Sequence, residues 1–259
     1  MFDFNFGERR LEGQTILVAG GTGGLGSATV VLLAKEGASV VVGYRHDEER
    51  ARELQSCVTN LYGAEAVYLV KGDITVPEVR SDYVSAADSF GNGLYAMVCF
   101  TGDPARVKFA EASDLDLENS LRKNYMAPIM LARESAVVMS KRKVSGAIVL
   151  LSSMQAVSVF KSSLNYAGPK VALAYAARIL AKDWGGPGGI RVNVVAPGVN
   201  SAGMALTSIE SGKYDHFIEE KIIPRFGCPE DVARVIRLLV EPDNYLTGQV
   251  VTVDGGLTL

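Results

Sequence analysis

An alternation of short β-rich runs with longer amphipathic stretches restricts the fold of this chain more than any other feature of its sequence. Seven runs are rich in β-branched residues and almost continuously apolar, a pattern typical of strands buried on both faces of a sheet. They lie at 15–19, 39–42, 66–70, 95–99, 147–151, 191–195 and 249–253. The stretches between them predict helices over about 25–36, 47–61, 77–90, 113–141, 165–184 and 230–240. Strands that alternate with helices predict the α/β class, as a doubly wound parallel sheet of about seven strands with helices on both faces.

No low-complexity linker or internal repeat interrupts this series, so we expect a single domain over residues 1–259. The segment 199–223 stands apart from the alternation. It is long, it contains Gly203 and Gly212, and it lies between the sixth strand and the last helix. Long segments of this kind in compact domains are often functional. We therefore predict that 199–223 forms a lid over the substrate.

Charge and cysteine content exclude several classes of function. The chain has 26 Lys and Arg against 29 Asp and Glu, a net charge of −3, which argues against binding to nucleic acid. The densest basic run, 141–143, is short and is interpreted as a solvated helix end. Cys57, Cys99 and Cys228 are far apart and not in metal-like pairs, so we expect neither a disulfide framework nor a metal site.

The sequence also carries no sign of export or of membrane insertion. Residues 1–6 lack the basic start and the long apolar run of a signal peptide. Nowhere does the chain reach 18 consecutive apolar residues, so we expect no membrane-spanning helix. These observations predict a cytoplasmic protein that does not bind membranes.

A glycine-rich turn follows the first predicted strand, where residues 20–26 read Gly-Gly-Thr-Gly-Gly-Leu-Gly and lead into a helix. Glycines let the backbone turn tightly and approach a ligand, and the helix N-terminus offers free N–H groups to a phosphate. The turn lies inside a strand–helix–strand unit of about 30 residues, as in Rossmann-type dinucleotide sites. We therefore predict a dinucleotide pyrophosphate here; the alternative is a tight turn with no ligand.

The end of the second predicted strand bears on the choice of cofactor. NAD sites usually place an acid here to bind the ribose 2′-hydroxyl. This chain has Tyr44 and Arg45 instead, and the first acid is Asp47. A carboxylate would repel a 2′-phosphate, whereas an arginine would bind it. The sequence thus favours NADP(H) and leaves NAD(H) open; the alternative for Arg45 is a solvated side chain at a helix start.

A serine, a tyrosine and a lysine form the candidate catalytic group. Tyr166 and Lys170 are four residues apart at the start of a predicted helix, so their side chains share one face. Ser153 closes the fifth strand, and ligands of doubly wound sheets lie beyond the carboxyl ends of the strands. A nearby ammonium lowers the pKa of a tyrosine from about 10 toward neutrality. We therefore expect Tyr166 to exchange a proton with a carbonyl oxygen that Ser153 hydrogen-bonds; the alternative is a surface pair without a function.

Taken together, these residues resemble the short-chain dehydrogenase/reductase family over roughly residues 13–257. The family glycine motif T-G-x-x-x-G-x-G matches 19–26 except for Ala19, and its Tyr-x-x-x-Lys motif matches 166–170. The resemblance implies a catalytic asparagine at Asn124, which would hold a water that links the lysine to solvent. It also implies an adenine-contacting aspartate at Asp73, a nicotinamide-binding segment at 191–198, and a C-terminal signature at 246–256.

The candidate catalytic residues are then Asn124, Ser153, Tyr166 and Lys170, and no metal ligand is expected. The candidate cofactor-binding residues are Gly20, Thr22, Gly23, Gly24, Leu25, Gly26, Tyr44, Arg45, Asp73, Ile74, Gly102, Asn124, Tyr166, Lys170, Pro197, Gly198 and Val199.

Four departures from the family pattern concern the floor and rim of the site. Residues 99–101 are Cys-Phe-Thr where the family usually has Asn-Asn-Ala. Asn200 replaces a usual aliphatic residue, and Ala202 replaces a threonine that often binds the carboxamide, a role that Ser201 is available to take. Pro169 lies directly before Lys170, where it removes one backbone donor, so we expect a slightly irregular first turn in a helix that begins near Asn165.

The sequence therefore predicts an NADP(H)-dependent oxidoreductase that interconverts a carbonyl and a secondary alcohol of a small molecule. Segments 103–109, 154–160 and 199–223 would form the pocket, and their apolar residues favour a hydrophobic or aromatic ketone over a sugar. These residues are Met154, Val157, Phe160, Met204, Leu206 and Phe217; alternatively they pack the lid onto the core. A second hypothesis is a dinucleotide-binding sensor or scaffold without turnover, and a third, a nucleotide-binding transferase, leaves Tyr166 and Lys170 unexplained.

The resemblance also implies a homo-oligomer, a tetramer or a dimer, because related proteins pair through helices near 113–141 and 165–184 and through the C-terminal strand. The helix after Asn165 is apolar over much of its circumference, which suggests a second partner beyond the sheet. The alternative is that this helix is buried under 199–223 within one chain.

Overall fold

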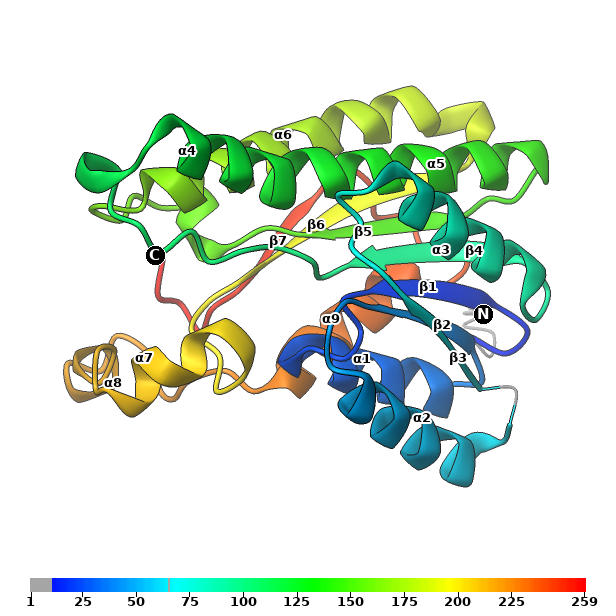
Figure 1. The fold of residues 1–259 in the computed structure, drawn as a ribbon, viewed down its shortest axis with the longest axis horizontal. Helices are drawn as coiled ribbons and strands as arrows, with labels where there is room; N and C mark the ends of the chain where they lie inside the picture. The colour runs from blue at the N-terminus through cyan, green and yellow to red at the C-terminus, as the bar shows by residue number, and fades with distance from the viewer. Residues whose placement is uncertain (1–10, 65) are drawn as a thin grey trace, which may run out of the picture.

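Seven parallel strands form one sheet in the order β3-β2-β1-β4-β5-β6-β7 in the computed structural model, which describes residues 11–64 and 66–259 (Figure 1). This confirms the predicted doubly wound α/β fold; the expectation about residues 1–6 lies outside the described residues. The strands are β1 (Thr15–Ala19), β2 (Ser39–Tyr44), β3 (Val67–Lys71), β4 (Leu94–Cys99), β5 (Ala147–Leu151), β6 (Arg191–Pro197) and β7 (Val250–Val253).

Helices cover both faces of this sheet (Figure 1). They are α1 (Gly24–Lys35), α2 (Glu48–Tyr62), α3 (Pro77–Ser89), α4 (Asp114–Leu121), α5 (Ala127–Lys141), α6 (Leu164–Trp184), α7 (Leu206–Glu210), α8 (His216–Glu219) and α9 (Pro229–Val240). Successive residues of β1 show why its sequence is continuously apolar. Leu17 belongs to the core cluster with α3, α5 and α6, whereas Ile16 and Val18 belong to the cluster with α1, α2 and α9.

The order of the strands reverses at β1, which pairs with β2 on one side and with β4 on the other. In doubly wound sheets, such a switch point opens a crevice beyond the carboxyl ends of the strands. The glycine turn after β1 and the segments that follow β2, β4 and β5 all begin at this edge of the sheet. The fold thus brings the candidate residues to one side of the molecule.

Two predicted elements differ in the structure. The helix expected over 113–141 is divided into α4 and α5 by a π turn at Arg122–Met126, in which the Ala127 N–H donates to the Arg122 carbonyl. The segment 199–223 contains a short 3-10 turn, Gly203–Ala205, and the helices α7 and α8, so it is less irregular than its sequence suggests. A local pattern of apolar residues does not distinguish a π turn from an α-helix, because both keep the chain helical.

Candidate active site

The glycine turn connects β1 to α1 in a conformation that needs glycine at several positions. Gly20 has a φ of +78°, and its N–H donates to the Gly43 carbonyl at the end of β2 over 2.8 Å. A Cβ on Gly26 would lie 2.3 Å from the Gly20 oxygen, and one on Gly24 would lie 2.6 Å from the Gly203 nitrogen. Helix α1 has Gly23 as its N-cap and no side-chain cap, so its first turn presents backbone N–H groups suited to a phosphate.

A cavity of about 400 Å³ lies beside this turn. Eight predicted cofactor-binding residues line it: Gly20, Thr22, Gly23, Tyr44, Arg45, Asp73, Ile74 and Gly102. Phe100 and Thr101, which the sequence placed at the floor of the site, also line it. Sequence reasoning missed other lining residues, among them His46, Asp47, Arg50, Thr75 and Lys123. The positions of His46, Asp47 and Thr75 shortly after β2 and β3 were a signal that would have found these three.

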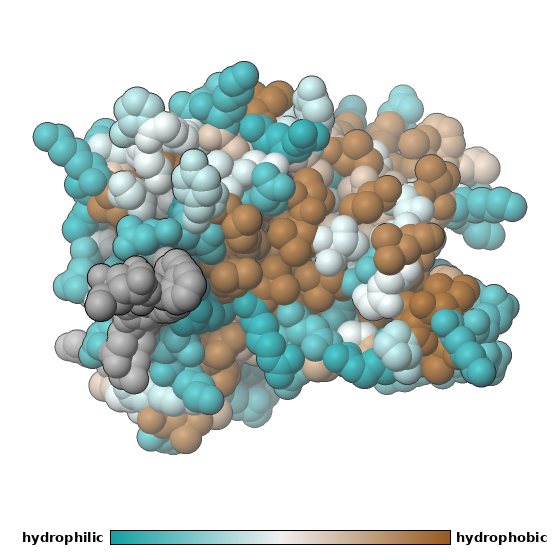
Figure 2. All heavy atoms as spheres, turned by 180° about the vertical axis from the view of Figure 1, so that it is seen from behind, coloured by the Kyte–Doolittle hydropathy of each residue, from teal (hydrophilic) through white to brown (hydrophobic). Residues whose placement is uncertain are grey.

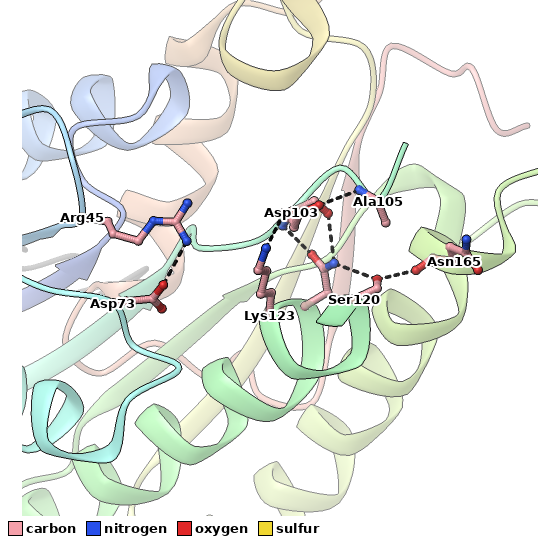
Figure 3. Close-up of polar contacts among 8 residues, drawn as sticks. Arg45, Asp73, Asp103, Ala105, Ser120, Lys123 and Asn165 are labelled. Atoms are coloured by element: carbon pink, nitrogen blue, oxygen red, sulfur yellow. Dashed lines mark hydrogen bonds and ion pairs between the residues drawn. The ribbon is translucent and has the colours of Figure 1, made fainter. Parts of the chain in front are cut away.

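Arg45 and Asp73 form an ion pair at this cavity, with 2.9 Å between Nη1 and Oδ2 (Figure 3). The other carboxylate oxygen of Asp73 accepts the Thr75 N–H at 2.9 Å, which fixes the aspartate more firmly than the arginine. Burial alone would raise the pKa of Asp73, but the Thr75 and Arg45 hydrogen bonds outweigh it and lower that pKa. Both residues predicted to contact the cofactor thus contact each other.

Ser153, Tyr166 and Lys170 lie at the carboxyl end of β5 and in the first turns of α6. Ser153 follows β5, and its Oγ accepts the Gln155 N–H at 3.2 Å. Lys170 is only 3% exposed, and its Nζ donates to the Leu151 carbonyl at 2.8 Å and lies 5.8 Å from the centre of the Tyr166 ring. The fold therefore brings together three side chains that the sequence spreads over residues 153–170.

Burial dominates the ionisation of this group. It raises the pKa of Tyr166, and a hydrogen bond with the Ser153 side chain lowers that pKa only in part. Burial also lowers the pKa of Lys170 to about 8. The expectation that the lysine ammonium lowers the tyrosine pKa is therefore wrong for the free protein. The sequence did not reveal that both groups leave water on folding.

Asn124 lies in the π turn between α4 and α5, and its side chain is fully buried. Its Oδ1 accepts the Asp103 N–H at 3.0 Å, and its Nδ2 donates to the Asp103 carbonyl at 2.9 Å and to Ser120 Oγ at 3.1 Å (Figure 3). A Cβ on Gly102 would lie 2.8 Å from Asn124 Oδ1 and 3.3 Å from Lys170 Nζ. Asn124 and Lys170 therefore both approach Gly102 where a side chain would otherwise stand, with the asparagine amide held in one orientation.

Pro169 leaves one backbone carbonyl of α6 without its usual partner, and the group that takes its place links α6 to Asn124. A helix that begins at Leu164 would pair the Asn165 carbonyl with the N–H of residue 169, but proline has none. The Ser120 hydroxyl donates to the Asn165 carbonyl instead, in a short hydrogen bond drawn in Figure 3. Ser120 is thus bonded to Asn124 on one side and to the residue before Tyr166 on the other. Sequence reasoning identified the proline but missed Ser120.

The loop after β4 joins the site to the predicted lid. Lys123 pairs with Asp103 at 2.9 Å, and the Asn165 amide donates to the Val107 carbonyl at 2.9 Å. From the same loop, the Arg106 guanidinium donates to the Met204 carbonyl at 3.1 Å. The loop is therefore bonded both to α6 and to the segment 199–223.

Pro197, Gly198 and Val199 lie at the end of β6. The Gly198 N–H donates to the Val253 carbonyl at 2.9 Å, and a Cβ on Gly198 would lie 2.6 Å from the Asp254 Cβ. Asn200 is buried, with its Nδ2 donating to the Gly198 carbonyl and its Oδ1 without a hydrogen-bond partner among the described residues. Ser201 is exposed, so the buried polar side chain at this position is Asn200.

Three further features of the described residues bear on other kinds of site. Cys57, Cys99 and Cys228 are unpaired. Over residues 11–64 and 66–259, no group of three or more His, Cys, Asp or Glu side chains is arranged to hold a metal. No helix in the same part of the chain has the length and apolarity to cross a membrane. The expected cytoplasmic location stays a prediction.

Comparison with known proteins decides the family. Residues 19–258 match the family model described as enoyl-(acyl carrier protein) reductase. The hydroxynaphthalene reductase-like protein Arp2 of Metarhizium majus is 34% identical over 263 residues, covering 96% of each chain. The chain belongs to the short-chain dehydrogenase/reductase family. Its members are oxidoreductases that use nicotinamide cofactors on small-molecule carbonyls and alcohols.

Solved structures agree with this membership in the short-chain dehydrogenase/reductases. A short-chain dehydrogenase/reductase from Serratia marcescens superposes with a TM-score of 0.87 at 29% identity, covering 96% of this chain and 100% of that one. The NADP-bound structure of ElxO superposes with a TM-score of 0.83 at 25% identity, covering 94% of this chain and 98% of that one.

Proposed function

We propose that this protein is an NADP(H)-dependent oxidoreductase that interconverts a carbonyl and a secondary alcohol. The observation that carries the proposal is the gathering of Ser153, Tyr166 and the buried Lys170 at the edge of the sheet where the glycine turn begins α1. The test is oxidation of NADPH by the purified protein against a panel of ketones.

The residues present fit a nicotinamide dinucleotide. A Cβ at position 24 or 26 would strike backbone atoms of Gly203 or Gly20, so the turn stays this tight only with glycine, and the adjoining cavity of about 400 Å³ offers an arginine and an aspartate beside glycine backbone. The glycine turn would hold the pyrophosphate, Asp73 and Ile74 the adenine, and 197–199 the nicotinamide. When bound, the nicotinamide supplies a hydride to the carbonyl carbon or accepts one from the alcohol.

The chain's own residues move and hold the proton. Tyr166 donates a proton to the carbonyl oxygen, or removes it from the alcohol in the reverse direction. Ser153 hydrogen-bonds the same oxygen and orients it toward Tyr166. Lys170 binds the nicotinamide ribose, and its charge favours the phenolate that Tyr166 becomes. Asn124 supports the path by which the proton is replaced from solvent.

We expect Arg45 to give the protein its preference for NADPH over NADH, an expectation supported by the NADP-bound relative ElxO. The Arg45→Ala variant should bind NADPH more weakly by about 1.5–3 kcal/mol, the contribution of a hydrogen bond to a charged group, and should bind NADH almost unchanged. Calorimetry with both cofactors measures the difference. Equal affinity of the unaltered protein for NADPH and NADH would contradict this assignment.

For the substrate we propose a hydrophobic or aromatic ketone. Val157, Met204 and Leu206 are 41–47% exposed in the segments predicted to surround the pocket, so packing of the lid onto the core leaves part of each side chain free. Exposed apolar groups near a site are typical of surfaces that bind apolar ligands. The relative Arp2, a hydroxynaphthalene reductase-like protein, supports an aromatic substrate class.

The second hypothesis, a dinucleotide-binding protein without turnover, is favoured by one set of observations. Phe100 and Thr101 line the cavity in place of smaller or more polar family residues, and Thr101 Oγ1 lies 3.1 Å from the buried Cys99 thiol. The raised pKa of Tyr166 in the free protein also lowers the fraction of phenolate that is present at neutral pH to accept a proton from an alcohol. Hydride transfer, if observed, excludes this reading.

We further propose a homotetramer. Val171, Tyr175 and Ile179 on α6 are each about half exposed or more, so 199–223 does not cover them, and β7 is an edge strand of the sheet. Figure 2 shows a broad apolar area on the face opposite to that of Figure 1. Areas of this kind mark contacts with other chains. Light scattering should therefore give a multiple of 27.6 kDa, and a mass near 27.6 kDa at micromolar concentration would exclude the oligomer.

A further inference from the structure

Asp73 pairs with the guanidinium of Arg45, the group that the proposed function assigns to binding the 2′-phosphate. The Arg45 Nη1 lies 2.9 Å from Asp73 Oδ2, and both side chains line the cavity beside the glycine turn (Figure 3). Their side chains are 46% and 32% exposed, so the pair is open to an incoming ligand. A phosphate that binds this guanidinium must replace the carboxylate or lie close to it.

The two partners differ in how firmly they are held. Asp73 Oδ1 accepts the Thr75 backbone N–H, which keeps the carboxylate at the end of β3. For Arg45, the structure gives no hydrogen bond within the described residues except the one to Asp73. Ligand binding is therefore expected to move the arginine and leave the aspartate, and its negative charge, in the cavity.

We propose that Asp73 is a specificity-determining residue that opposes the 2′-phosphate and limits the preference for NADP(H) over NAD(H). A phosphate bound to the Arg45 guanidinium lies close to the fixed carboxylate of Asp73. The carboxylate repels the phosphate and competes with it for the guanidinium N–H donors. A ribose 2′-hydroxyl carries no charge and meets no such repulsion. The inference rests on the proposed function, because it assumes that the adenosine end of a dinucleotide binds in this cavity.

The test compares two fragments that differ only in the phosphate, adenosine 2′,5′-bisphosphate and adenosine 5′-monophosphate, by calorimetry at one fixed salt concentration. In Asp73→Asn, the ratio of their dissociation constants should shift at least about fivefold toward the bisphosphate. The ratio cancels any loss of an adenine contact, since both fragments carry adenine. The same shift should appear between NADPH and NADH.

Asp47→Asn is the matched control. Asp47 lines the same cavity, but its carboxylate accepts the Arg50 N–H as the N-cap of α2, and asparagine caps equally well. This variant removes one negative charge without releasing Arg45, so its ratio should shift less than about twofold. An equal shift in both variants would mean that net charge alone acts, and would overturn the inference.

The remaining outcomes separate the inference from the proposed function. An unchanged ratio in Asp73→Asn, with a parent that prefers the bisphosphate, overturns the inference and leaves the proposed NADP(H) preference standing. If the parent binds both fragments equally and Asp73→Asn prefers the bisphosphate, the inference is supported and the proposed NADP(H) preference of the parent is contradicted. If neither fragment nor either cofactor binds, both proposals fall.

Discussion

Replacement of Tyr166 by phenylalanine should lower turnover by about 10²–10⁴-fold and leave NADPH affinity within about twofold of the parent. The change removes only the hydroxyl that exchanges the proton, while the ring and its place on α6 stay. The Ser153 side chain loses one hydrogen-bond partner, and Lys170 keeps its bond to the Leu151 carbonyl. Steady-state kinetics with a ketone from the panel and calorimetry with NADPH measure the two quantities.

Tyr175→Phe is the control for this experiment, because Tyr175 is on the same helix but 64% exposed. It should turn over like the parent. Residual activity of Tyr166→Phe within about threefold of the parent would show that another group transfers the proton.

Replacement of Lys170 by methionine should lower turnover at least about 10²-fold and should change the pH dependence of stability in the free protein. In the proposed function Lys170 binds the nicotinamide ribose and its charge favours the phenolate that Tyr166 becomes, and an uncharged methionine can do neither. The buried lysine is itself a cost to folding: a pKa of about 8 in place of 10.5 corresponds to roughly 3 kcal/mol against the charged form.

The sign of the pH effect follows from proton binding. Between about pH 8 and 10.5 the unfolded chain keeps a proton on this lysine that the folded chain has lost, so the stability of the parent rises with pH in this window. The methionine variant lacks this contribution. The unfolding free energy of the variant minus that of the parent should therefore be largest below about pH 8. This difference should fall by roughly 3 kcal/mol between about pH 8 and 10.5.

Urea unfolding of the parent and the variant at several pH values tests this. Titrations of groups that do not interact with Lys170 cancel in the difference, whereas the buried Cys99 thiol interacts with its charge and adds a change of its own. The unpartnered Leu151 carbonyl of the variant adds a cost of about 1–3 kcal/mol that does not vary with pH. A difference that is flat from about pH 7 to 10.5 would contradict a lowered pKa of Lys170.

The strands and the site's location could be predicted from the sequence because they depend on local pattern. Continuous apolar runs such as Ile148–Leu150 have no stable place except in a sheet covered on both faces. The glycines at 20, 24 and 26 require a close backbone approach wherever they stand, and the structure gives each a neighbour that a Cβ would strike or, at Gly20, a positive φ. Strand ends then bring Ser153 to the same edge of the sheet as this turn.

What could not be predicted depends on contacts between distant segments. In the sequence, Ser120 is an ordinary helix residue. Its role depends on Pro169, far along the chain, which leaves the Asn165 carbonyl free to accept the Ser120 hydroxyl. The ion pair of Arg45 with Asp73 needs β2 and β3 to end side by side, which the separate motifs do not state. The ionisation of Tyr166 and Lys170 was predicted from their charges, but burial outweighs charge there, and burial is a property of the assembled fold.

The central claim is that the site transfers hydride to a carbonyl. The most direct measurement incubates the protein with a panel of apolar and aromatic ketones and NADPH that carries deuterium at its transferable position, and then weighs the products by mass spectrometry. We predict that at least one ketone yields an alcohol with one deuterium on the former carbonyl carbon, and that Tyr166→Phe yields almost none. Binding of NADPH by the parent without a deuterated alcohol from any ketone would contradict the claim and favour a protein that binds the dinucleotide without turnover.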